Sequence, residues 1–298
     1  MPDESVYGNS GGLETYSKAQ NLIQRLLDWF KDKNSVLVAF SGGVDSTLVA
    51  YAAYRALGSR VLTVTVASPM FPREEVEEAV KLARLIGVRH RVVEIDMLND
   101  SKVVENPPDR CYYCKRLMLK ALTEVAEAEG LELLVDGSNA EDYRDFRPGL
   151  KALREFKVRS PLAELDFSKN DVRTVSRFLG LPTADKPSMA CLASRIPYGV
   201  ELTYDRLKRV SEAESYIRQL TGVKQVRVRD HGGIARIEVG RDERRGFFKE
   251  ELMDIIWAKL RSLGYVYVTL DLYGYRSGSL NEPLDSPQPP PSPGEKSA

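Results

Sequence analysis

The sequence has little of several features that would place it in a special class of protein. Its 298 residues carry 43 lysines and arginines against 43 aspartates and glutamates, and this zero net charge argues against a protein that grips long nucleic acid. No apolar run approaches the roughly 18 residues that a membrane span requires, and the polar start, MPDESVYGNSGGLE, does not resemble a signal peptide. Three cysteines are too few for a disulfide framework. We therefore expect a cytoplasmic protein that does not bind membranes.

The rest of the composition, 29% charged and 43% hydrophobic, is typical of a globular protein, and the length indicates one large and one small domain. We expect both ends to be disordered. Residues 1–12 are polar and rich in glycine, and the segment 277–298 contains six of the sixteen prolines. The hydrophobic pattern changes near residue 195, so we assign 13–195 to one domain and 196–276 to the other.

In the first domain, apolar runs alternate with helical patterns. The β-branched run Val61–Ala67 is typical of a buried strand, and the residues after Pro72 place apolar side chains at the spacing of one helix face. This order predicts an α/β fold with a doubly wound parallel sheet, whereas the second domain has the pattern of a small α+β fold. The expected strands are 36–40, 61–67, 91–96 and 131–136, then 225–230, 234–239 and 265–270; the expected helices are 46–57, 72–86 and 115–129, then 204–220 and 243–263.

The strongest motif is Ser41-Gly42-Gly43-Val44-Asp45-Ser46-Thr47, between an apolar strand and a helix. Two glycines allow a tight turn that aims successive N–H groups at one point, and the helix N-terminus completes an anion site sized for pyrophosphate. Ser41 and Ser46 add hydroxyl donors, and Asp45 either caps the helix or helps to hold Mg²⁺. The alternative is an ordinary strand-to-helix turn that binds no ligand, because Ser, Gly and Asp are common turn residues. Neither G-x-x-x-x-G-K-[ST] nor G-x-G-x-x-G occurs as a competing motif.

The three cysteines are a second signal. Cys111 and Cys114 form a C-x-x-C pair in RCYYCKR, just before a predicted helix, and we expect the helix N-terminus and the basic neighbours to lower their thiol pKa values. A single cysteine such as Cys191 is commonly a small buried hydrophobe, but a C-x-x-C pair favours metal or redox chemistry. Three cysteines suit a [4Fe–4S] cluster with one open iron. A C-x-x-C disulfide that cycles with Cys191 is the second reading, and zinc is the third, with His231 as a fourth ligand that we expect in a hairpin turn of the other domain.

SGGVDS after the first strand resembles the pyrophosphate loop (PP-loop) of the adenine-nucleotide α-hydrolase superfamily. The resemblance implies that the chain binds ATP with Mg²⁺, cleaves it between the α and β phosphates, and adenylates a substrate oxygen. It places Ser68 and Met70, at the end of the second strand, near the adenine. It places Gly137, in DGSN, near the ribose and phosphates.

Three further segments make the resemblance more specific: DGSNAEDYRDFRPG (136–149), CLASRIPYG (191–199) and VRVRDHGGIARIEV (226–239). Over about residues 15–276, the chain is similar to the ATP-dependent sulfur transferases that synthesise the nickel-pincer nucleotide cofactor of lactate racemase. The resemblance implies that ATP adenylates a carboxylate of a pyridinium mononucleotide and that sulfur then displaces AMP. It assigns ATP binding to 13–195 and substrate binding to 196–276, and it implies a homo-oligomer that works beside lactate racemase maturation proteins.

Family members differ in their source of sulfur. Those with only the cysteine that matches Cys191 sacrifice its sulfur. This sequence departs from that pattern because it also carries Cys111 and Cys114, and it resembles the three-cysteine branch, in which a [4Fe–4S] cluster delivers sulfide. The resemblance therefore makes all three cysteines cluster ligands and gives catalytic roles to Cys191 and Asp45, while the origin of the sulfur, cluster or Cys191, stays open.

The second domain contains a candidate phosphate site. Alternation along the predicted hairpin places Arg227, Arg229 and Arg236 on one face, and guanidinium groups make bidentate contacts with phosphate. A solvated face with a cross-strand Arg–Glu pair explains the same pattern. The resemblance implies that these arginines, together with Arg195, bind the substrate phosphate. It also implies that the charged segment 141–147 faces the nucleotide.

Two other functions fit part of the sequence. A tRNA thiolase of the same superfamily combines this ATP loop with three cysteines, but the chain shows neither an added RNA-binding module nor a basic face. An ATP-binding scaffold with a structural metal would bind ATP without turnover.

Overall fold

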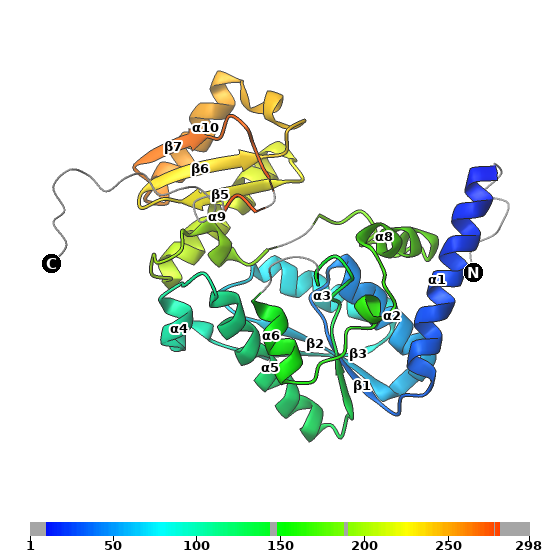
Figure 1. Cartoon of the computed structure of the whole chain (residues 1–298). Helices are drawn as coiled ribbons and strands as arrows, with labels where there is room; N and C mark the ends of the chain where they lie inside the picture. The colour runs from blue at the N-terminus through cyan, green and yellow to red at the C-terminus, as the bar shows by residue number, and fades with distance from the viewer. Residues whose placement is uncertain (1–9, 144–147, 188–189, 277, 281–298) are drawn as a thin grey trace, which may run out of the picture. The chain divides into compact units, whose positions relative to one another are not determined.

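The computed structural model describes residues 10–143, 148–187, 190–276 and 278–280, with side chains from residue 14 onward. The chain divides into two compact units (Figure 1). The larger unit comprises Met1–Cys191 with Glu201–Tyr204, and the smaller unit comprises Leu192–Val200 with Asp205–Ala298. Most of the two segments that we expect to be disordered lies outside the described residues, although the first helix already begins at Ser10.

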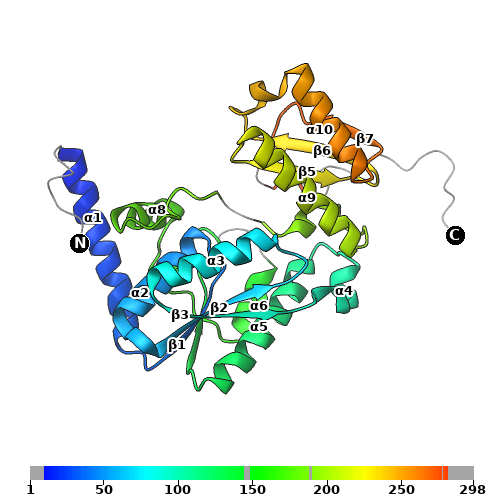
Figure 2. The same cartoon turned by 180° about the vertical axis from the view of Figure 1, so that it is seen from behind.

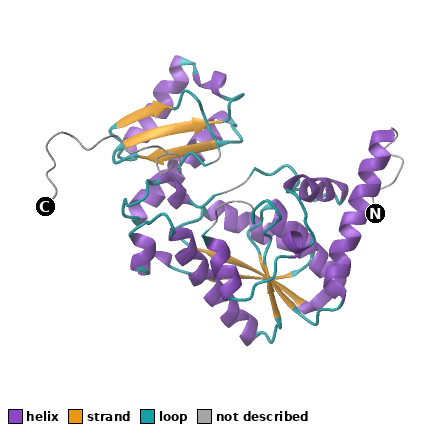
Figure 3. Cartoon of the chain, viewed as in Figure 1, coloured by secondary structure: helices purple, strands orange, loops and turns teal. Residues whose placement is uncertain are grey.

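The larger unit is built on four parallel strands, drawn as arrows in Figure 3. They are β1 (Val36–Ala39), β2 (Val61–Ala67), β3 (Arg89–Glu94) and β4 (Leu133–Val135). Their order is β3-β2-β1-β4, and Val36 of β1 is in register with Val61 and Leu133. The two central strands are buried almost throughout, as expected of a parallel sheet that is covered on both faces. The predicted doubly wound α/β fold is confirmed.

Helices cover both faces of this sheet. They are α1 (Ser10–Lys31), α2 (Val44–Leu57), α3 (Arg73–Ile86), α4 (Ser101–Val104), α5 (Arg110–Ala128), α6 (Gly149–Glu155), α7 (Pro161–Glu164) and α8 (Lys169–Phe178), with short 3-10 turns η2 (Gly58–Arg60) and η3 (Met97–Asn99). Helices α1, α2, α3 and α8 share one apolar core with β1 and β2, in which Phe30, Leu48 and Phe167 are completely buried. Helix α5 contacts β1 and β4 and packs against α6, and the opposite views in Figures 1 and 2 place α5 and α3 on different faces of the sheet.

The strand order creates a switch point beside β1. From β1 the chain adds β2 and then β3 on one side, and it later returns to place β4 on the other side. In sheets of this type, ligands bind in the crevice outside the carboxyl ends of the strands at the switch point. SGGVDS follows β1 and Gly137 follows β4, so the fold brings both motifs to this crevice.

The smaller unit is a three-stranded sheet with two main helices. Its elements are η4 (Leu192–Arg195), α9 (Tyr204–Thr221), β5 (Val226–Asp230), β6 (Ile234–Val239), η5 (Arg244–Phe247), α10 (Glu250–Ser262) and β7 (Tyr267–Leu270). Strands β5 and β6 form an antiparallel hairpin with His231 in its turn, as predicted, and β7 pairs with β6 in parallel. Alternate residues such as Val228 and Ile237 form the core with Ile217 and Leu260 of the helices. The predicted small α+β domain is therefore present. None of the described helices is long and apolar enough to cross a membrane.

The start of α5 differs from its predicted position. The helix begins at Arg110, five residues earlier than predicted, with Asp109 as its N-cap. Aspartate is one of the preferred N-cap residues, and this signal favours the earlier start. Cys111 and Cys114 therefore lie inside the first turns of the helix rather than before it.

Three smaller predictions also require correction. β3 begins two residues early, at Arg89, because its pairing with β2 starts at Leu62. The helix predicted over 243–263 is divided into η5 and α10, and Gly246, which has low helix propensity, lies in the first part. Ser279, which we expected in the disordered tail, is only 4% exposed because its hydroxyl lies between Arg229 and Glu238.

Candidate active site

The SGGVDS loop packs closely against two other segments. Gly42 has φ +68°, which favours glycine, and a Cβ there would lie 3.1 Å from Cα and Cβ of Ala79 in α3. A Cβ on Gly137 would lie 2.7 Å from the amide nitrogen of Ser46 and 3.0 Å from its Cα. Only glycine lets the segment after β4 approach the N-terminus of α2 this closely. The two segments form a narrow cradle beside the first N–H groups of that helix, where anions bind favourably.

Two serine hydroxyls stabilise the loop from within. The Oγ atoms of Ser41 and Ser46 are 3.0 Å apart, and the N–H of Gly43 donates to Ser41 Oγ over 3.3 Å. The Ser46 hydroxyl is 3.3 Å from the carbonyl oxygen of Gly43, to which it donates. The predicted hydroxyl donors are thus in the loop and oriented by its backbone.

A cavity of about 250 Å³ adjoins the loop. Its wall combines polar groups of the two motifs with apolar side chains of β2, α3 and α5, which is the mixture that a nucleotide with an apolar base and anionic phosphates requires. The lining residues are Ala39, Phe40, Ser41, Asp45, Ser46, Val64, Thr65, Val66, Phe71, Glu75, Val76, Lys115, Met118, Leu122, Asp136, Gly137, Ser138 and Asp142.

Asp45 is held by partners from two distant segments. Its carboxylate accepts a hydrogen bond from Asn139 Nδ2 at 3.1 Å and forms an ion pair with Lys169, the first residue of α8. It does not cap α2, because the N-cap residue is Gly43. Asp45 lines the cavity together with Asp136 and Asp142. Since carboxylate oxygens are preferred ligands of Mg²⁺, this donor chemistry fits a magnesium ion bound with a nucleotide.

Asp136, the residue directly after β4, is the centre of a hydrogen-bond network that the sequence did not reveal. It is 3% exposed and accepts from the N–H (3.2 Å) and hydroxyl (2.7 Å) of Ser138 and from Ser160 Oγ (2.6 Å). Lys115 Nζ lies 3.5 Å away. Lys115 directly follows Cys114 in α5. The same turn of this helix therefore carries a cysteine that is a candidate cluster ligand and a lysine that lines the cavity.

The predicted adenine residues, Ser68 and Met70, are not among the described residues that line the cavity. Met70 is 1% exposed and belongs to the core, and its N–H donates to Ser68 Oγ at 3.4 Å. Their neighbours in the chain, residues 64–66 and Phe71, do line it.

The three cysteines gather at the start of α5. Arg110 is 1% exposed, and its Nη2 lies 4.0 Å from Sγ of Cys111 and 3.9 Å from Sγ of Cys191. Cys114 lies one turn further along the same helix. A buried guanidinium between two sulfur atoms stabilises negative charge there, whether it is carried by a thiolate or by a group that the sulfurs bind.

The prediction of lowered thiol pKa values is wrong for Cys114. Burial raises the pKa of this thiol to about 12, the charge of Cys191 acts in the same direction, and together they outweigh the lowering by Arg110. The sequence shows the basic neighbours but not the burial, and here burial decides the sign. Without a metal, Cys114 is a neutral thiol.

The donor set fits an iron–sulfur cluster in kind and number. A cubane with one open iron takes three cysteine ligands, and coordination itself would drive the loss of the thiol protons. His231, the proposed fourth zinc ligand, belongs to the smaller unit. Across the described residues, no group of three or more His, Cys, Asp or Glu side chains already converges on a metal position.

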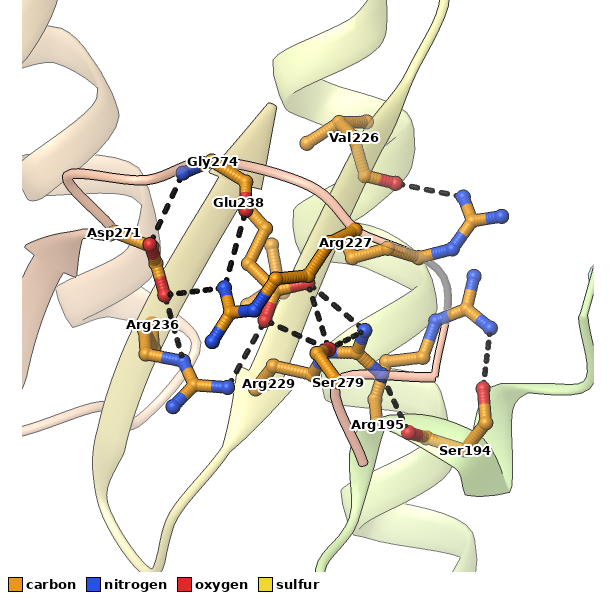
Figure 4. A network of polar contacts seen from close by, with 12 residues as sticks. Ser194, Arg195, Val226, Arg227, Arg229, Arg236, Glu238, Asp271, Gly274 and Ser279 are labelled. Carbon is orange, nitrogen blue, oxygen red and sulfur yellow. Dashed lines mark hydrogen bonds and ion pairs between the residues drawn. The ribbon is translucent and has the colours of Figure 1, made fainter. Parts of the chain in front are cut away.

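The β5–β6 hairpin gathers the predicted arginines on one face. Arg227 is opposite Glu238 and Arg229 is opposite Arg236, and Figure 4 shows the resulting network. Glu238 is completely buried and accepts from Arg229 at 2.8 Å and from Arg236 at 2.9 Å. The arginines are clustered and a cross-strand carboxylate neutralises part of their charge. The face is buried rather than solvated, since Arg227 is 3% and Arg229 7% exposed, and binding of a phosphate there stays a prediction.

Arg195 and Arg227 lie deeper in the same unit. Arg195 makes a bidentate pair with Glu214 of α9 at 2.8 and 2.9 Å, and Glu214 also accepts from the N–H of Val228. Arg195 thus fixes η4 to the core of the unit. Burial and, next, the charge of Arg195 lower the pKa of Arg227 to about 10. An anion bound beside Arg227 would offset this repulsion.

The charged segment 141–147 is only partly described, since residues 144–147 lie outside the described part of the chain. Asp142 lines the cavity, and Glu141 accepts from the backbone N–H of Lys169 at 2.8 Å. Lys186 Nζ donates to the carbonyl of Gly42 at 3.1 Å. Sequence reasoning missed both lysines because no motif marks them and each lies more than 120 residues from its partner in the loop.

Comparison with known proteins adds independent information. Residues 15–108 match the family model for NAD synthase. A Synechocystis protein described as uncharacterized is 44% identical over 268 residues, which cover 90% of this chain and 98% of the relative. The pyridinium-3,5-bisthiocarboxylic acid mononucleotide synthase of Lactiplantibacillus plantarum is 43% identical over 259 residues, 87% of this chain and 93% of the relative. An uncharacterized Methanocaldococcus jannaschii protein is 30% identical over 261 residues, 87% of this chain and 98% of the relative.

The parallel sheet, the SGGVDS loop at its switch point and the matched family model define an α/β enzyme of the ATP-utilising PP-loop class. The similarity to the L. plantarum synthase is too long to be confined to one of the two units. The chain belongs to the pyridinium-3,5-bisthiocarboxylic acid mononucleotide synthase family. The resemblance noted in the sequence is confirmed.

Proposed function

We propose that the chain is an ATP-dependent sulfur transferase of nickel-pincer cofactor biosynthesis, which converts a carboxylate of a pyridinium mononucleotide into a thiocarboxylate. One observation carries the proposal. The first two turns of helix α5 contain Cys111 and Cys114, and Lys115, the residue after Cys114, lies in the wall of the cavity beside the PP-loop. One helix of the larger unit thus carries both candidate cluster ligands and a residue of the nucleotide cavity.

The proposed reaction has two displacements. A carboxylate oxygen of the substrate attacks the α-phosphorus of ATP, the bond to the oxygen that bridges to the β-phosphorus breaks, and pyrophosphate leaves. A sulfur nucleophile then attacks the acyl carbon, and AMP leaves with the former carboxylate oxygen. Each displacement moves one electron pair to the leaving group, so no oxidant or reductant is needed.

The residues of the cavity have separate roles in this proposal. The N–H and hydroxyl groups of Ser41 to Ser46 bind the pyrophosphate portion, and Gly137 leaves room for the ribose and phosphates. Asp45 helps to hold Mg²⁺, which neutralises charge on the phosphates. The Lys115 ammonium, next to Asp136, offsets the charge that develops at the α-phosphorus.

We assign Cys111, Cys114 and Cys191 as ligands of a [4Fe–4S] cluster, which when bound supplies an open iron for sulfide. Arg110 keeps two of these side chains near one another. Anaerobically purified protein should contain about four irons per chain with acid-labile sulfide, and Cys114→Ala should lose both. Iron-free protein after careful reconstitution would contradict the assignment, and loss of one sulfur from Cys191 after reaction would then identify that residue as the donor.

We further propose 13–195 as the ATP-binding domain and 196–276 as the substrate domain, with the substrate phosphate near Arg227, Arg229 and Arg236. The clustered guanidinium groups and the lowered pKa of Arg227, caused by burial and by Arg195, favour an anion there. Arg227→Met should raise KM for the pyridinium nucleotide severalfold and leave KM for ATP unchanged. A rise in both constants would contradict this division of roles.

The function is tested by measuring AMP and pyrophosphate in reactions of the holoprotein with ATP, Mg²⁺, sulfide and pyridinium-3,5-biscarboxylic acid mononucleotide. Both products should form in equal amounts, and only when the pyridinium nucleotide is present. Ser46→Ala, which removes a loop hydroxyl, should slow the reaction, and Ser262→Ala, at an exposed position of α10, is the matched control. Product formation with tRNA instead of the pyridinium nucleotide would favour the tRNA thiolase.

A further inference from the structure

The peptide bond between Gly42 and Gly43 is flanked by glycine on both sides, so side chains restrict its orientation less than that of any other peptide in the pyrophosphate loop. Neither residue has a Cβ, and Gly42 already has φ +68°, so this peptide can rotate with little steric resistance. Its N–H and C=O point in opposite directions, and the two orientations have opposite consequences. One presents a donor to a bound phosphate, and the other presents an acceptor that repels it. The loop therefore needs a device that selects one orientation.

In the structure, this peptide is held at both ends. The N–H of Gly43 donates to Ser41 Oγ at 3.3 Å, and Ser41 is one of the residues that line the cavity. The carbonyl oxygen of Gly42 accepts from Nζ of Lys186 at 3.1 Å. The N–H of this peptide thus faces Ser41 in the cavity wall, and its C=O faces Lys186.

Lys186 is itself held in place. Its Nζ forms an ion pair with Glu78 of α3 at 2.8 Å, and its side chain is only 13% exposed. Arg173 of α8 donates to the carbonyl oxygens of Ala184 at 2.6 Å and of Lys186 at 2.9 Å. Because both the backbone and the ammonium group are fixed before a ligand arrives, little side-chain entropy is lost when the loop binds one.

We propose that Lys186 is a positioning residue that selects the anion-binding orientation of the Gly42–Gly43 peptide. Its ammonium group stabilises the carbonyl on the side away from Ser41. By polarising the peptide, it also strengthens the N–H of Gly43 as a donor. The inference rests on the proposed function, because it requires that the loop binds the pyrophosphate portion of ATP.

Binding of inorganic pyrophosphate to the full chain tests the inference. Calorimetric titrations with pyrophosphate are compared with titrations of AMP, which lacks the β and γ phosphates. Lys186→Met removes the charge at similar side-chain length, and we expect the Kd of pyrophosphate to rise about tenfold, the scale of one charge-assisted hydrogen bond. The Kd of AMP should change much less. Lys186→Arg donates to the same oxygens and should restore most of the affinity, and Lys81→Met, which removes an exposed lysine of α3, should match the wild type.

A second measurement separates orientation from simple attraction of charge. With ¹⁵N-labelled glycine, the Gly43 amide should give one NMR signal in the wild type and a broadened or doubled signal in Lys186→Met, because both peptide orientations become populated. Unchanged pyrophosphate affinity overturns the inference, and so does an equal loss of pyrophosphate and AMP binding. Weakened pyrophosphate binding with an unchanged Gly43 signal also overturns it, since Lys186 would then act by direct attraction. A wild type that binds neither ATP nor pyrophosphate would overturn the proposed function instead.

Discussion

Replacing Gly137 by alanine tests the contact that shapes the nucleotide cradle. The new Cβ would lie 2.7 Å from the Ser46 nitrogen, 3.0 Å from its Cα and 3.1 Å from the Asp45 carbonyl carbon. All three are backbone atoms of the first turn of α2, so no side chain can rotate away to make room. Either the segment after β4 or the helix must shift. Overpacking of this kind costs about 1–3 kcal/mol, and the shift displaces the N–H groups that the proposed function assigns to pyrophosphate.

We expect Gly137→Ala to lower the free energy of unfolding of the larger unit by about 1–3 kcal/mol, measured by urea denaturation. The Kd of ATP, measured by calorimetry, should rise about tenfold, equivalent to the loss of one charge-assisted hydrogen bond. Gly246→Ala is the control, because no heavy atom of the described residues beyond its chain neighbours lies within 4 Å of the Cβ position. Wild-type stability together with wild-type ATP affinity in Gly137→Ala would refute the reasoning.

Three further predictions concern buried groups. Glu214→Gln leaves Arg195 buried without its carboxylate and should destabilise the smaller unit by about 3–5 kcal/mol; an unchanged urea midpoint would contradict this. Burial alone would raise the pKa of Glu214, but Arg195, Arg227 and the N–H of Val228 together outweigh it and keep the pKa below the ordinary 4.5. This stabilisation is therefore complete above pH 4.5 and is lost as the pH falls through the folded-state pKa, so an identical acid unfolding profile in Glu214→Gln would argue against it. Because burial raises the pKa of Cys114 to about 12, iodoacetamide should modify this thiol slowly at pH 8 in metal-free protein, with a rate that rises about tenfold per pH unit; rapid modification at pH 8, seen by peptide mass spectrometry, would contradict it.

The parts of the site that sequence reasoning could predict are those encoded by neighbouring residues. SGGVDS contains its own turn, donors and helix start, so its place after a buried strand follows from the local sequence. The alternation of apolar runs and helical patterns likewise predicts the parallel sheet, and a parallel sheet places Gly137 near that loop. The arginine cluster on the hairpin follows from the two-residue period of a strand.

What could not be predicted depends on packing between distant segments. Lys169 and Lys186 reach the loop only because α8 and the residues after it pack beside α2, and no local pattern distinguishes them from surface lysines. The raised pKa of Cys114 has the same origin, because the basic neighbours are visible in the sequence whereas the burial that outweighs them is not. Asp136 was visible only as the end of a strand, and its partner Ser160 comes from a separate segment.

Sulfur transfer itself is tested most directly by mass spectrometry of the pyridinium nucleotide after anaerobic incubation with the chain, ATP, Mg²⁺ and sulfide. We predict that one carboxylate oxygen is replaced by sulfur and that one AMP forms for each sulfur inserted. AMP release without the pyridinium nucleotide, or ATP consumption that leaves the mass of this nucleotide unchanged, would contradict the proposed function.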